Sequence, residues 1–450
     1  MRLACFTPLP PERSGIARYA AELLPVLARR HAIDVYTSEP GAQDALDGIE
    51  AFSAHDFVSK HGQRPYDLVV YQLGNARCHD YMWAYLARYP GLVVLHDAQL
   101  HQARARALIA RARADRFRTE FAFDHPHAPP DARELGTVGF LGDLVYLWPM
   151  LRLPVESARL VAVHSAWLAE RLRRDYPDAA VESIRMGVSD PLAGASGPGE
   201  ARARGRKRLG LAAADVAFGA FGGVTPEKRV PQMLRALAAI RDVAPAVRLV
   251  LVGAEASHYD VRRDVAEAGV ADRVTHAGYV DDAALDDCLA AVDVCLCLRW
   301  PSNYETSASW LRCLAAGKPT VVTDLPHLTD VPALFNPGNG TPPPPGTGSD
   351  AGAAPVTVAI DILDEDRALP DILRSLAAAA ELRRRLGERA RAWWRAHHRM
   401  DLMARDYEGL IAMAATRPAR TLPGVLLPDS SEHVRELLAP FDLDLPDVFS

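Results

Sequence analysis

The feature of this sequence that most constrains its fold is the alternation of short apolar runs with helical patterns. In the first half, the apolar runs are rich in Val and Leu at their centres: Arg2–Phe6, Leu68–Tyr71, Gly91–Leu95 and Leu160–Val163. A parallel strand that is buried on both faces has this composition. Between the first two runs, Ile16–Arg29 repeats its apolar residues at helical spacing. The first half therefore predicts parallel strands joined by helices.

The second half of the chain follows the same pattern. Further apolar runs predict strands at Ala217–Phe221, Val247–Val252, Val292–Leu298 and Pro319–Thr323. Pro231 opens a helix at a position where its missing N–H has no cost. The apolar stripe of that helix is Met233, Leu234, Leu237 and Ile240. Strands alternating with helices in both halves predict the α/β class, with two Rossmann-like, doubly wound domains.

The length of 450 residues is too great for one ordinary hydrophobic core. Small, turn-forming residues at 190–199 indicate a boundary between two domains. Pro337–Pro355 predicts a surface loop within the second domain, and Ser431–Leu438 gives a short helical signal near the end. We therefore expect an N-terminal domain at 1–190, a linker at 191–206, a C-terminal domain at 207–395, a helix crossing back to the first domain at 396–416 and a tail at 417–450.

Composition and charge narrow the functional classes. The formal net charge of −6 argues against a nucleic-acid-binding role, because such domains are strongly basic. The six cysteines form no C-x-x-C pair, and Cys295 and Cys297 lie in an apolar run, so we expect core thiols rather than a metal or redox site. Free cysteines, no secretory leader and no apolar stretch of about 18 residues predict a soluble, cytoplasmic protein.

The first glycine turn is a candidate anion site. Gly15 stands between the first predicted strand and the first predicted helix. A backbone without a side chain can approach a ligand closely there, and the helix N-terminus offers N–H groups to an anion. A purely steric role for the glycine is the alternative.

Polar residues follow two of the predicted strands in the first half. His96 and Asp97 come directly after Gly91–Leu95, and Asn75 and His79 follow Leu68–Tyr71, with His101 further along the chain. Ligands bind beyond the carboxyl ends of the strands in open α/β sheets. Three converging histidines would form a polar acceptor pocket, whereas a single histidine at a strand end is more often structural.

A second glycine turn follows the strand Ala217–Phe221. Gly222 and Gly223 free the backbone to wrap a diphosphate, and Lys228 supplies a compact positive charge. A fixed cation at a leaving nucleotide would stabilise the transition state of glycosyl transfer, where negative charge develops. A solvated Lys-Arg pair in an exposed turn is the alternative.

The segment Arg299–Arg312 joins a predicted strand to a predicted helix that ends at Gly317. We expect Glu305 in the first turn of that helix, with Thr306 and Ser307 beside it. Its carboxylate could bind sugar hydroxyls, or could simply favour the helix dipole by about 0.3–1 kcal/mol. On the same helix, Arg312 would share a face with Glu305 about 10 Å away.

The order of these motifs resembles glycosyltransferase family 4, a group of retaining enzymes with the two-Rossmann GT-B fold and a central cleft. The resemblance rests on Phe221–Lys228, Val247–Gly253, Ala277–Val280, Glu305–Gly317 and Pro319–Val322, with Pro8–Gly15, Arg185–Val188 and Arg389–Leu410 as further matches. It covers nearly the whole chain. It implies an acceptor-side first domain and a nucleotide-sugar donor domain at 207–395.

The resemblance also implies roles for single residues. Lys228 would neutralise the donor diphosphate, His96 would hold the donor sugar, and Glu305 would bind the sugar hydroxyls. Gly15, Gly222, Gly223, Arg299, Thr306, Ser307 and Arg312 would contribute to donor binding, and Asn75, His79, Asp97 and His101 would face the acceptor. Such enzymes of the hexosyltransferase type work with retention, without a metal ion or other cofactor and without a protein nucleophile.

This sequence departs from the family pattern at two positions. The arginine that commonly stands beside the first glycine of the lysine loop is Gly223 here. The family also has two glutamates separated by seven residues; aligned on Gly317, the first falls at Tyr304, one place before Glu305, and the second is Arg312. We expect Arg299 or Arg312 to supply the missing positive charge at the diphosphate.

A basic cluster predicts a further partner. If one helix carried them, arginines would align on its faces: Arg104, Arg106, Arg111, Arg113, Arg116 and Arg118. A solvated face is the default interpretation. Attraction to an anionic inner leaflet or to a lipid-linked acceptor is the alternative, and it would suit polysaccharide biosynthesis.

Two other functional classes compete with a transferase. An NAD-dependent oxidoreductase or epimerase would need G-x-G-x-x-G after a strand and an acidic residue about 20 positions on, and neither glycine turn has this pattern. A non-catalytic interaction protein on a decayed transferase scaffold is the other candidate. The sequence does not identify the donor base, the sugar or the acceptor.

Overall fold

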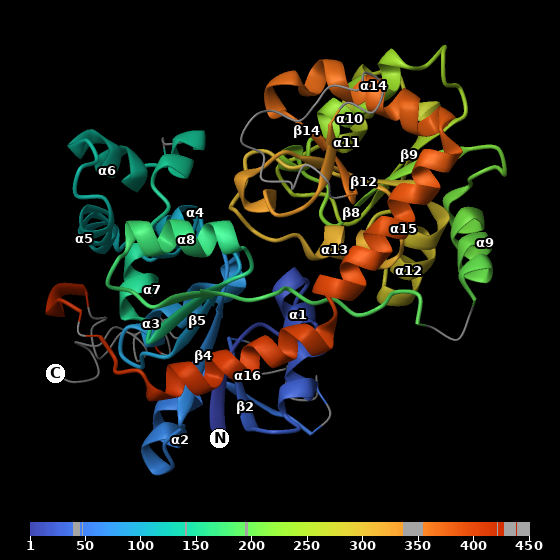
Figure 1. Ribbon diagram of the computed structural model, residues 1–450. Helices are drawn as coiled ribbons and strands as arrows, with labels where there is room; N and C mark the ends of the chain where they lie inside the picture. The colour runs from blue at the N-terminus through green and yellow to red at the C-terminus, as the bar shows by residue number, and fades with distance from the viewer. Residues whose placement is uncertain are drawn as a thin grey trace. The chain divides into compact units, whose positions relative to one another are not determined.

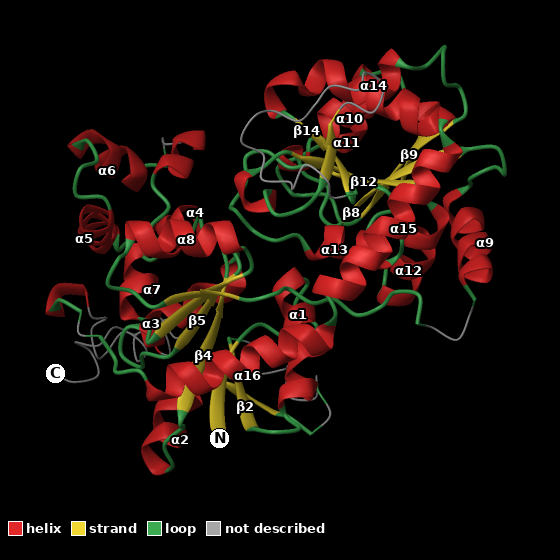
Figure 2. Ribbon diagram, viewed as in Figure 1, coloured by secondary structure: helices red, strands yellow, loops and turns green. Residues whose placement is uncertain are grey.

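The computed structural model describes residues 1–38, 46, 48–139, 142–193, 197–335, 354–420, 422–426 and 438. The chain divides into two compact units. Unit 1 comprises Met1–Arg185, Asn303–Thr306 and Met400–Ser450, and unit 2 comprises Met186–Ser302 and Ser307–Arg399. Each unit contains one seven-stranded sheet with helices against it (Figures 1 and 2). The predicted α/β class with two Rossmann-like domains is confirmed.

The sheet of unit 1 is parallel throughout its described pairings, and its order is β3-β2-β1-β4-β5-β6-β7. Its strands are β1 (Arg2–Phe6), β2 (Ala32–Thr37), β3 (Glu50–Ser53), β4 (Leu68–Leu73), β5 (Leu92–Leu95), β6 (Leu160–Val163) and β7 (Val181–Ser183). The order reverses between β1 and β4, so the crevice where doubly wound sheets bind ligands opens beyond these strands.

Helices cover both faces of this sheet. They are α1 (Gly15–Leu27), α2 (Phe57–Gln63), α3 (Trp83–Leu86), α4 (His101–Ala110), α5 (Ala114–Asp124), α6 (Pro130–Thr137), α7 (Arg152–Ser157), α8 (Ala166–Asp175) and α16 (Met400–Thr416), with short 3₁₀ helices η2 (Ala54–Asp56), η3 (Arg77–Met82), η4 (Gly142–Leu147) and η9 (Gly424–Leu426). α16 packs against α1 and reaches β4, β5 and β6. In the part of the chain that the structure describes, the last long helix therefore belongs to the unit that begins the chain.

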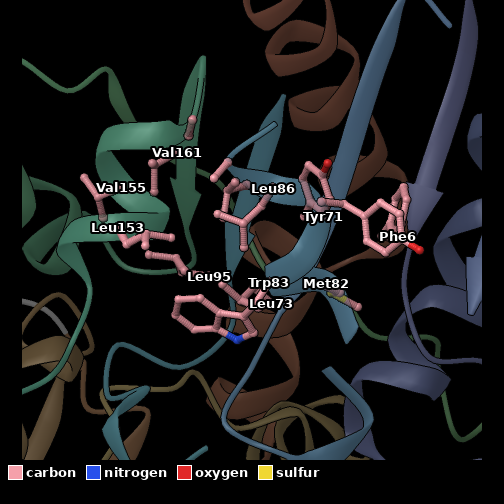
Figure 3. Close-up of a cluster of buried hydrophobic side chains, with 14 of the residues drawn as sticks. Phe6, Tyr71, Leu73, Met82, Trp83, Leu86, Leu95, Leu153, Val155 and Val161 are labelled. Carbon is pink, nitrogen blue, oxygen red and sulfur yellow. The ribbon is translucent and has the colours of Figure 1, made fainter. Parts of the chain in front are cut away.

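The core of unit 1 is unusually aromatic. Phe6, on β1, lies with its ring centroid 5.2 Å from that of Tyr36 and 5.0 Å from that of Tyr71. Figure 3 shows how this cluster continues over β4 and β5 to side chains of η3, α3 and α7, among them Met82, Trp83 and Leu153. Large rings fill the space between sheet and helices, and such contacts dominate the packing energy of a core.

Unit 2 repeats the architecture with the order β10-β9-β8-β11-β12-β14-β13. Its strands are β8 (Val216–Phe221), β9 (Val247–Val252), β10 (Val274–His276), β11 (Val294–Cys297), β12 (Thr320–Thr323), β13 (Ala333–Phe335) and β14 (Thr357–Ile360). Its helices are α9 (Pro198–Leu209), α10 (Val230–Ala239), α11 (Val261–Glu267), α12 (Asp282–Ala291), α13 (Ala308–Ala315), α14 (Glu365–Ala378) and α15 (Ala380–His397), with short 3₁₀ helices η5 (Pro226–Lys228), η6 (Ala271–Arg273), η7 (Pro326–Leu328) and η8 (Ile362–Asp364). The switch point lies between β8 and β11.

The eight strands that the sequence predicts all exist, with ends that shift by up to two residues. Six further strands were not predicted: β2, β3, β7, β10, β13 and β14. Four of them, β3, β7, β10 and β13, are the edge strands of their sheets, and β2 and β14 lie next to an edge. Most of the six carry polar residues, such as Asp34 in β2, which pairs with Arg2 across the sheet at 2.9 Å. Strands with partly solvated faces lack the continuous apolar run that marks a buried parallel strand.

The expected linker at 191–206 is helical from Pro198 onward. Pro198 begins α9, and Gly210 ends it in the left-handed conformation. Gly205 lies so close to α12 that a Cβ there would be 2.0 Å from the carbonyl oxygen of Asp287. The sequence did not predict this helix because it has many basic residues and no clear apolar stripe. A glycine, rather than a large apolar side chain, makes its contact with α12. Pro337–Pro355, up to residue 353, and Ser431–Leu438, up to residue 437, lie outside the described residues.

The arginine cluster does not form one helix face. α4 ends at Ala110 and α5 begins at Ala114, with Ala112 in the left-handed conformation between them. Arg104 is buried and donates two 2.7 Å hydrogen bonds to Glu120, and Arg116 donates one of 2.6 Å to the same carboxylate. Although burial alone would raise the pKa of Glu120, these two guanidinium groups hold it below its ordinary value. The prediction of a solvated basic stripe is wrong for these arginines.

Candidate functional site

Polar groups of unit 1 gather where β4, β5 and β6 end. His96 follows β5 directly, and His164 follows β6 in the same position. Their ring centroids lie 5.2 Å apart, and the ring of Tyr19, on α1, lies 4.7 Å from His96. The sequence reasoning missed His164 although the same signal, a histidine directly after an apolar run, marks both residues.

Gln72 connects His96 and His79 to α16. Its side-chain oxygen lies 2.7 Å from His96 Nε2, and its backbone oxygen lies 2.9 Å from His79 Nδ1. Its side-chain nitrogen donates to the hydroxyl of Tyr407 at 3.1 Å, and that hydroxyl lies 2.6 Å from the hydroxyl of Tyr19. With Gln72 accepting from Nε2, the neutral His96 ring presents Nδ1 as an acceptor.

Burial keeps these histidines neutral. His96 is 8 % exposed, and burial lowers its pKa well below the ordinary value, with His164 and His79 adding to the effect. Burial also lowers the pKa of His79 to about 4, against the opposing effect of its bond to Gln72. A neutral imidazole can accept a hydrogen bond from a sugar hydroxyl, which a protonated one cannot do.

Asn75 and Asp97 lie together, whereas His101 lies elsewhere. The Asp97 carboxylate accepts from the backbone N–H of Asn75 at 2.7 Å, and the Asn75 side chain accepts from Ala103 N–H in the first turn of α4 at 2.9 Å. His101 is buried between Phe117 and Phe121 and its Nδ1 lies 2.8 Å from the carbonyl oxygen of Trp148. The expected convergence of three histidines is therefore corrected to His79, His96 and His164.

The segment 303–306 belongs to unit 1, although the chain on either side of it belongs to unit 2. Asn303 accepts a 2.7 Å hydrogen bond from Ala98 N–H through its backbone oxygen, and Thr306 donates to the carbonyl oxygen of His164 at 3.3 Å. The ring of Tyr304 stacks on that of Trp167 at 5.6 Å. These contacts fix the backbone of Glu305 beside the ends of β5 and β6.

Glu305 is not in the first turn of a helix, as we expected. Ser307 is the N-cap of α13 and accepts from Trp310 N–H at 3.3 Å, so Glu305 stands two residues before the cap. Its Oε2 accepts from the backbone N–H of Asn303 at 2.9 Å. Tyr304 adopts the left-handed conformation and ends any helical continuation. Arg312 is a buried residue of α13 and Glu305 lies outside that helix, so the two do not share a helix face.

In unit 2, Lys228 lies at the carboxyl end of β8. Its Nζ donates to the carbonyl oxygen of Phe221, the last residue of that strand, at 2.7 Å. Thr225 O accepts from Lys228 N–H at 3.3 Å, and Glu227 O accepts from Trp300 N–H at 2.7 Å. The lysine loop is thus bound to its own strand and to the segment that follows β11.

The two glycines of this loop differ in what they do. Gly222 has a φ of +89°, and a Cβ there would lie 2.5 Å from Lys228 Nζ. A Cβ on Gly223 would have no neighbour closer than 3.9 Å. Gly253, at the end of β9, is also required, because its Cβ would lie 2.1 Å from the carbonyl oxygen of Gly222. The expectation that both loop glycines are needed for backbone approach holds for Gly222 alone.

Two other donor-side predictions, Gly15 and Arg299, have these surroundings. Gly15 is the first residue of α1, capped by Ser14, and a Cβ on it would meet nothing within 4 Å. Arg299 donates its backbone N–H to Thr323 at 3.0 Å. Arg229 was not predicted, yet its guanidinium pairs with the buried carboxylate of Glu365 at 2.8 Å and joins the lysine loop to the start of α14. A partner 136 residues away leaves no local signal in the sequence.

These two units define the fold class. Two Rossmann-like units, each with a switch point and with polar groups at the carboxyl ends of its strands, are the components of the GT-B fold. Sucrose-phosphate synthase from Thermosynechococcus elongatus matches with a TM-score of 0.62 at 16% identity, over 92% of this chain and 98% of its own. HepE from Anabaena, in complex with UDP and glucose, matches with a TM-score of 0.63 at 15% identity, over 92% and 99%. At these identities the similarity establishes the fold.

A family match covers much of unit 2 together with the segment 303–306 of unit 1. Residues 215–341 match the family described as "Glycosyl transferases group 1", and this segment contains Lys228, Glu305 and Arg312. The predicted resemblance is confirmed at the level of group 1, and family 4 is a finer assignment than this match makes. The catalytic domain of starch synthase IV from Arabidopsis thaliana, bound to ADP and acarbose, also has this fold, with a TM-score of 0.55 at 14% identity over 92% and 99%. No curated protein matches the chain in sequence.

Within the described ranges, no helix is both long and apolar enough to cross a membrane. In the same part of the chain, no three His, Cys, Asp or Glu side chains are grouped as ligands for a metal ion.

Proposed function

We propose that this protein is a glycosyltransferase that moves a sugar from a nucleotide-sugar donor to a hydroxyl acceptor. The observation that carries the proposal is the Lys228 loop. Within the segment that matches group 1 transferases, a glycine without a Cβ leaves room for a lysine ammonium at the end of a central strand. A compact cation at that position suits the diphosphate of a leaving nucleotide.

The proposed chemistry needs no protein nucleophile. The acceptor hydroxyl would attack the anomeric carbon on the face from which the nucleotide departs, so that the configuration is retained. The leaving phosphate would take the acceptor proton, and Lys228 would stabilise the charge that develops there. We propose that metal ions are not required, because Lys228 and arginine side chains supply the positive charge.

Side chains of unit 1 would bind the sugars. The neutral ring of His96 would accept from a donor-sugar hydroxyl, and Glu305, held through Asn303, would accept from others. Asn75, Asp97 and His79 belong to the acceptor side of the proposal. His101 does not, because its ring lies between Phe117 and Phe121.

A direct test uses UDP-, GDP- and ADP-sugars with the full chain. We expect one of them to stabilise the protein, by about 2.7 kcal/mol at 100 times its dissociation constant, and to be hydrolysed or transferred. Lys228→Ala should abolish both effects, whereas Lys207→Ala, an exposed lysine of α9, should change neither. No stabilisation and no turnover with any of the three would favour a non-catalytic interaction protein on this scaffold instead.

Arg299 and Arg312 remain our candidates for the second positive charge at the diphosphate. Arg312 is buried in α13, and Arg299 lies between β11 and the segment 303–306. We expect Arg299→Ala or Arg312→Ala to raise the KM for the donor sugar. Unchanged donor KM and turnover in both variants would exclude this role. Circular dichroism of each variant separates loss of binding from loss of fold.

Peripheral contact with an anionic membrane is also part of the proposal. Aliphatic side chains of α6, its C-cap and η4 are exposed: Leu135 at 42 %, Val138 at 63 %, Leu144 at 52 % and Leu147 at 66 %. α6 packs on α5, which carries Arg118. We expect the double variant Leu144→Ser/Leu147→Ser to lose binding to vesicles that contain phosphatidylserine, and Val243→Ser, 65 % exposed in unit 2, to retain it. Binding that ignores anionic lipid content would contradict the proposal.

A further inference from the structure

A cavity of about 510 Å³ opens in unit 1 among α7, the second half of α8 and the segments that follow α5 and α8. α8 returns from the carboxyl end of β6 toward the amino end of β7, so its last residue, Asp175, lies toward the amino ends of the strands. His96, His164 and Glu305 stand beside the opposite ends. None of these three residues lines the cavity, although Arg171, which does, lies 5.0 Å from the centroid of the Tyr304 ring, next to Glu305.

Three arginines and four acidic residues line this cavity. All but Asp124 form pairs: Arg152 with Glu156 at 2.8 Å, Arg171 with Asp175 at 3.5 Å, and Arg420 with Asp178 at 3.9 Å. Such a lining neither attracts nor repels an ion strongly, because each cation has an anion beside it. It offers many hydrogen-bond donors and acceptors to a neutral molecule. Hydroxyl groups fit it, since each can donate to a carboxylate and accept from a guanidinium.

Apolar and aromatic residues also line the cavity. Pro126, Pro149 and Pro177 line the cavity, and so does Tyr176, at the end of α8. Ligand sites commonly combine apolar walls with a few placed polar groups. A pyranose ring has this division, with C–H groups on its faces and hydroxyls around its edge.

A buried carboxyl forms one end of the cavity. Asp124 Oδ2 accepts from Arg152 N–H at 2.6 Å, and Oδ1 lies 3.3 Å from Nε2 of His125, which itself accepts from Met150 N–H at 3.2 Å. Burial raises the pKa of Asp124 to about 7, against the opposing effect of its backbone bonds. Near neutral pH this carboxyl is therefore partly protonated, and it adds little to the negative charge of the lining.

We propose that this cavity is a second carbohydrate site, which binds a neutral oligosaccharide away from the reacting groups. Hydroxyls of the bound sugar donate to Glu156 and Asp175, and the ring faces lie against proline and Tyr176. The choice of a carbohydrate among polyhydroxyl ligands rests on the proposed function. Binding itself requires neither a nucleotide nor transfer, so the two proposals can fail separately.

The test is titration calorimetry of the full chain with maltotriose, cellotriose and mannotriose. We expect at least one of these trisaccharides to bind. The double variant Glu156→Gln/Asp175→Asn should weaken that binding by at least about tenfold, because two charge-assisted hydrogen bonds become neutral ones. Glu170→Gln, an exposed carboxylate of α8 outside the cavity, is the matched control and should bind like the unaltered chain.

Two outcomes overturn the inference. One is the absence of binding for all three trisaccharides, and the other is binding that the double variant retains. Thermal stabilisation by the best nucleotide sugar, measured on the same three proteins, reports separately on the proposed function. We expect it to be equal in all three, which also shows that the double variant is folded.

Discussion

At the residue scale, the lysine loop depends on one missing side chain. Lys228 Nζ occupies the space that a Cβ on Gly222 would need, and the next glycine has open space around it. The sequence places both glycines and the lysine after an apolar run, but only the geometry distinguishes them. Gly222 adopts a positive φ, which residues with a Cβ avoid, and Gly223 does not.

We expect Gly222→Ala to weaken nucleotide-sugar binding strongly and to destabilise the fold by about 1–2 kcal/mol, the cost of a left-handed residue with a Cβ. The new methyl group would move Lys228 Nζ from the end of β8. Gly223→Ala is the control and should bind the donor normally. Calorimetry with the best donor and urea unfolding measure the two effects. Equal donor affinity and equal stability of the two variants would contradict the role assigned to Gly222.

The histidine group was only partly predictable at this scale. His96 follows from its place at a strand end, and His164 could have been found by the same rule. Gln72 lies within β4, which the apolar pattern ends two residues early. Tyr407 stands 335 residues from Gln72, so its contact has no local cause in the sequence. It arises because α16 packs across the carboxyl halves of the central strands.

At the element scale, buried ion pairs hold α4 and α5 together. Glu120 is 2 % exposed and accepts from Arg104 and Arg116. The arginine spacing suggested one helix with a charged stripe, but Ala112 breaks the helix and turns the second part back. Arg104 and Glu120 form a buried ion pair between the two helices because this break lets Arg104 of α4 reach α5.

We expect Glu120→Gln to destabilise unit 1 by about 3–5 kcal/mol, because breaking a buried pair leaves its partner charges uncompensated. Glu134→Gln removes the exposed partner of Arg118 and should have a much smaller effect, because solvent screens an exposed ion pair. Urea unfolding of the two variants gives the comparison. A loss for Glu120→Gln as small as that of the control would show that the buried pair adds no stability.

A close helix contact in unit 2 offers a second test at this scale. A Cβ on Gly387 of α15 would lie 2.2 Å from the carbonyl oxygen of Gly317, which follows α13. We expect Gly387→Ala to destabilise the protein by about 1–3 kcal/mol through overpacking. Gly409→Ala, in α16, meets nothing within 4 Å and should stabilise its helix by up to about 1 kcal/mol. Thermal unfolding distinguishes the two, and a neutral Gly387→Ala would refute the contact.

At the scale of the whole molecule, the stability of the fold depends on pH through buried histidines and a buried aspartate. The two kinds of group act in opposite directions. The pKa of His79 is lowered to about 4 and that of His96 falls as well, so the unfolded chain binds more protons than the folded one below about pH 6.5. Their contribution is complete above that pH and is lost as the pH falls toward 4. Asp124, with its pKa raised to about 7, is protonated when folded, so its contribution is complete at low pH and is lost between about pH 4 and 7.

We therefore expect His79→Gln to reduce the loss of stability between pH 6.5 and 4.5, relative to the unaltered chain. Asp124→Asn should change the slope in the opposite direction, because it removes the term that favours low pH. His258→Gln is the control, since its side chain is 63 % exposed. Urea unfolding at a series of pH values measures all three. Parallel curves for every variant would contradict these assignments.

The sequence by itself determined the two doubly wound units and the lysine loop, because buried parallel strands need unbroken apolar runs and a loop glycine leaves a local mark. It also identified the strand ends after which His96 and Asp97 stand. The tertiary structure alone decided that Glu305 precedes its helix within a segment of unit 1, and that His101 lies in an aromatic cluster. It also decided that Gln72 meets Tyr407 and that Glu120 neutralises two arginines. Those outcomes depend on packing between residues far apart in the chain, and no local pattern records such contacts.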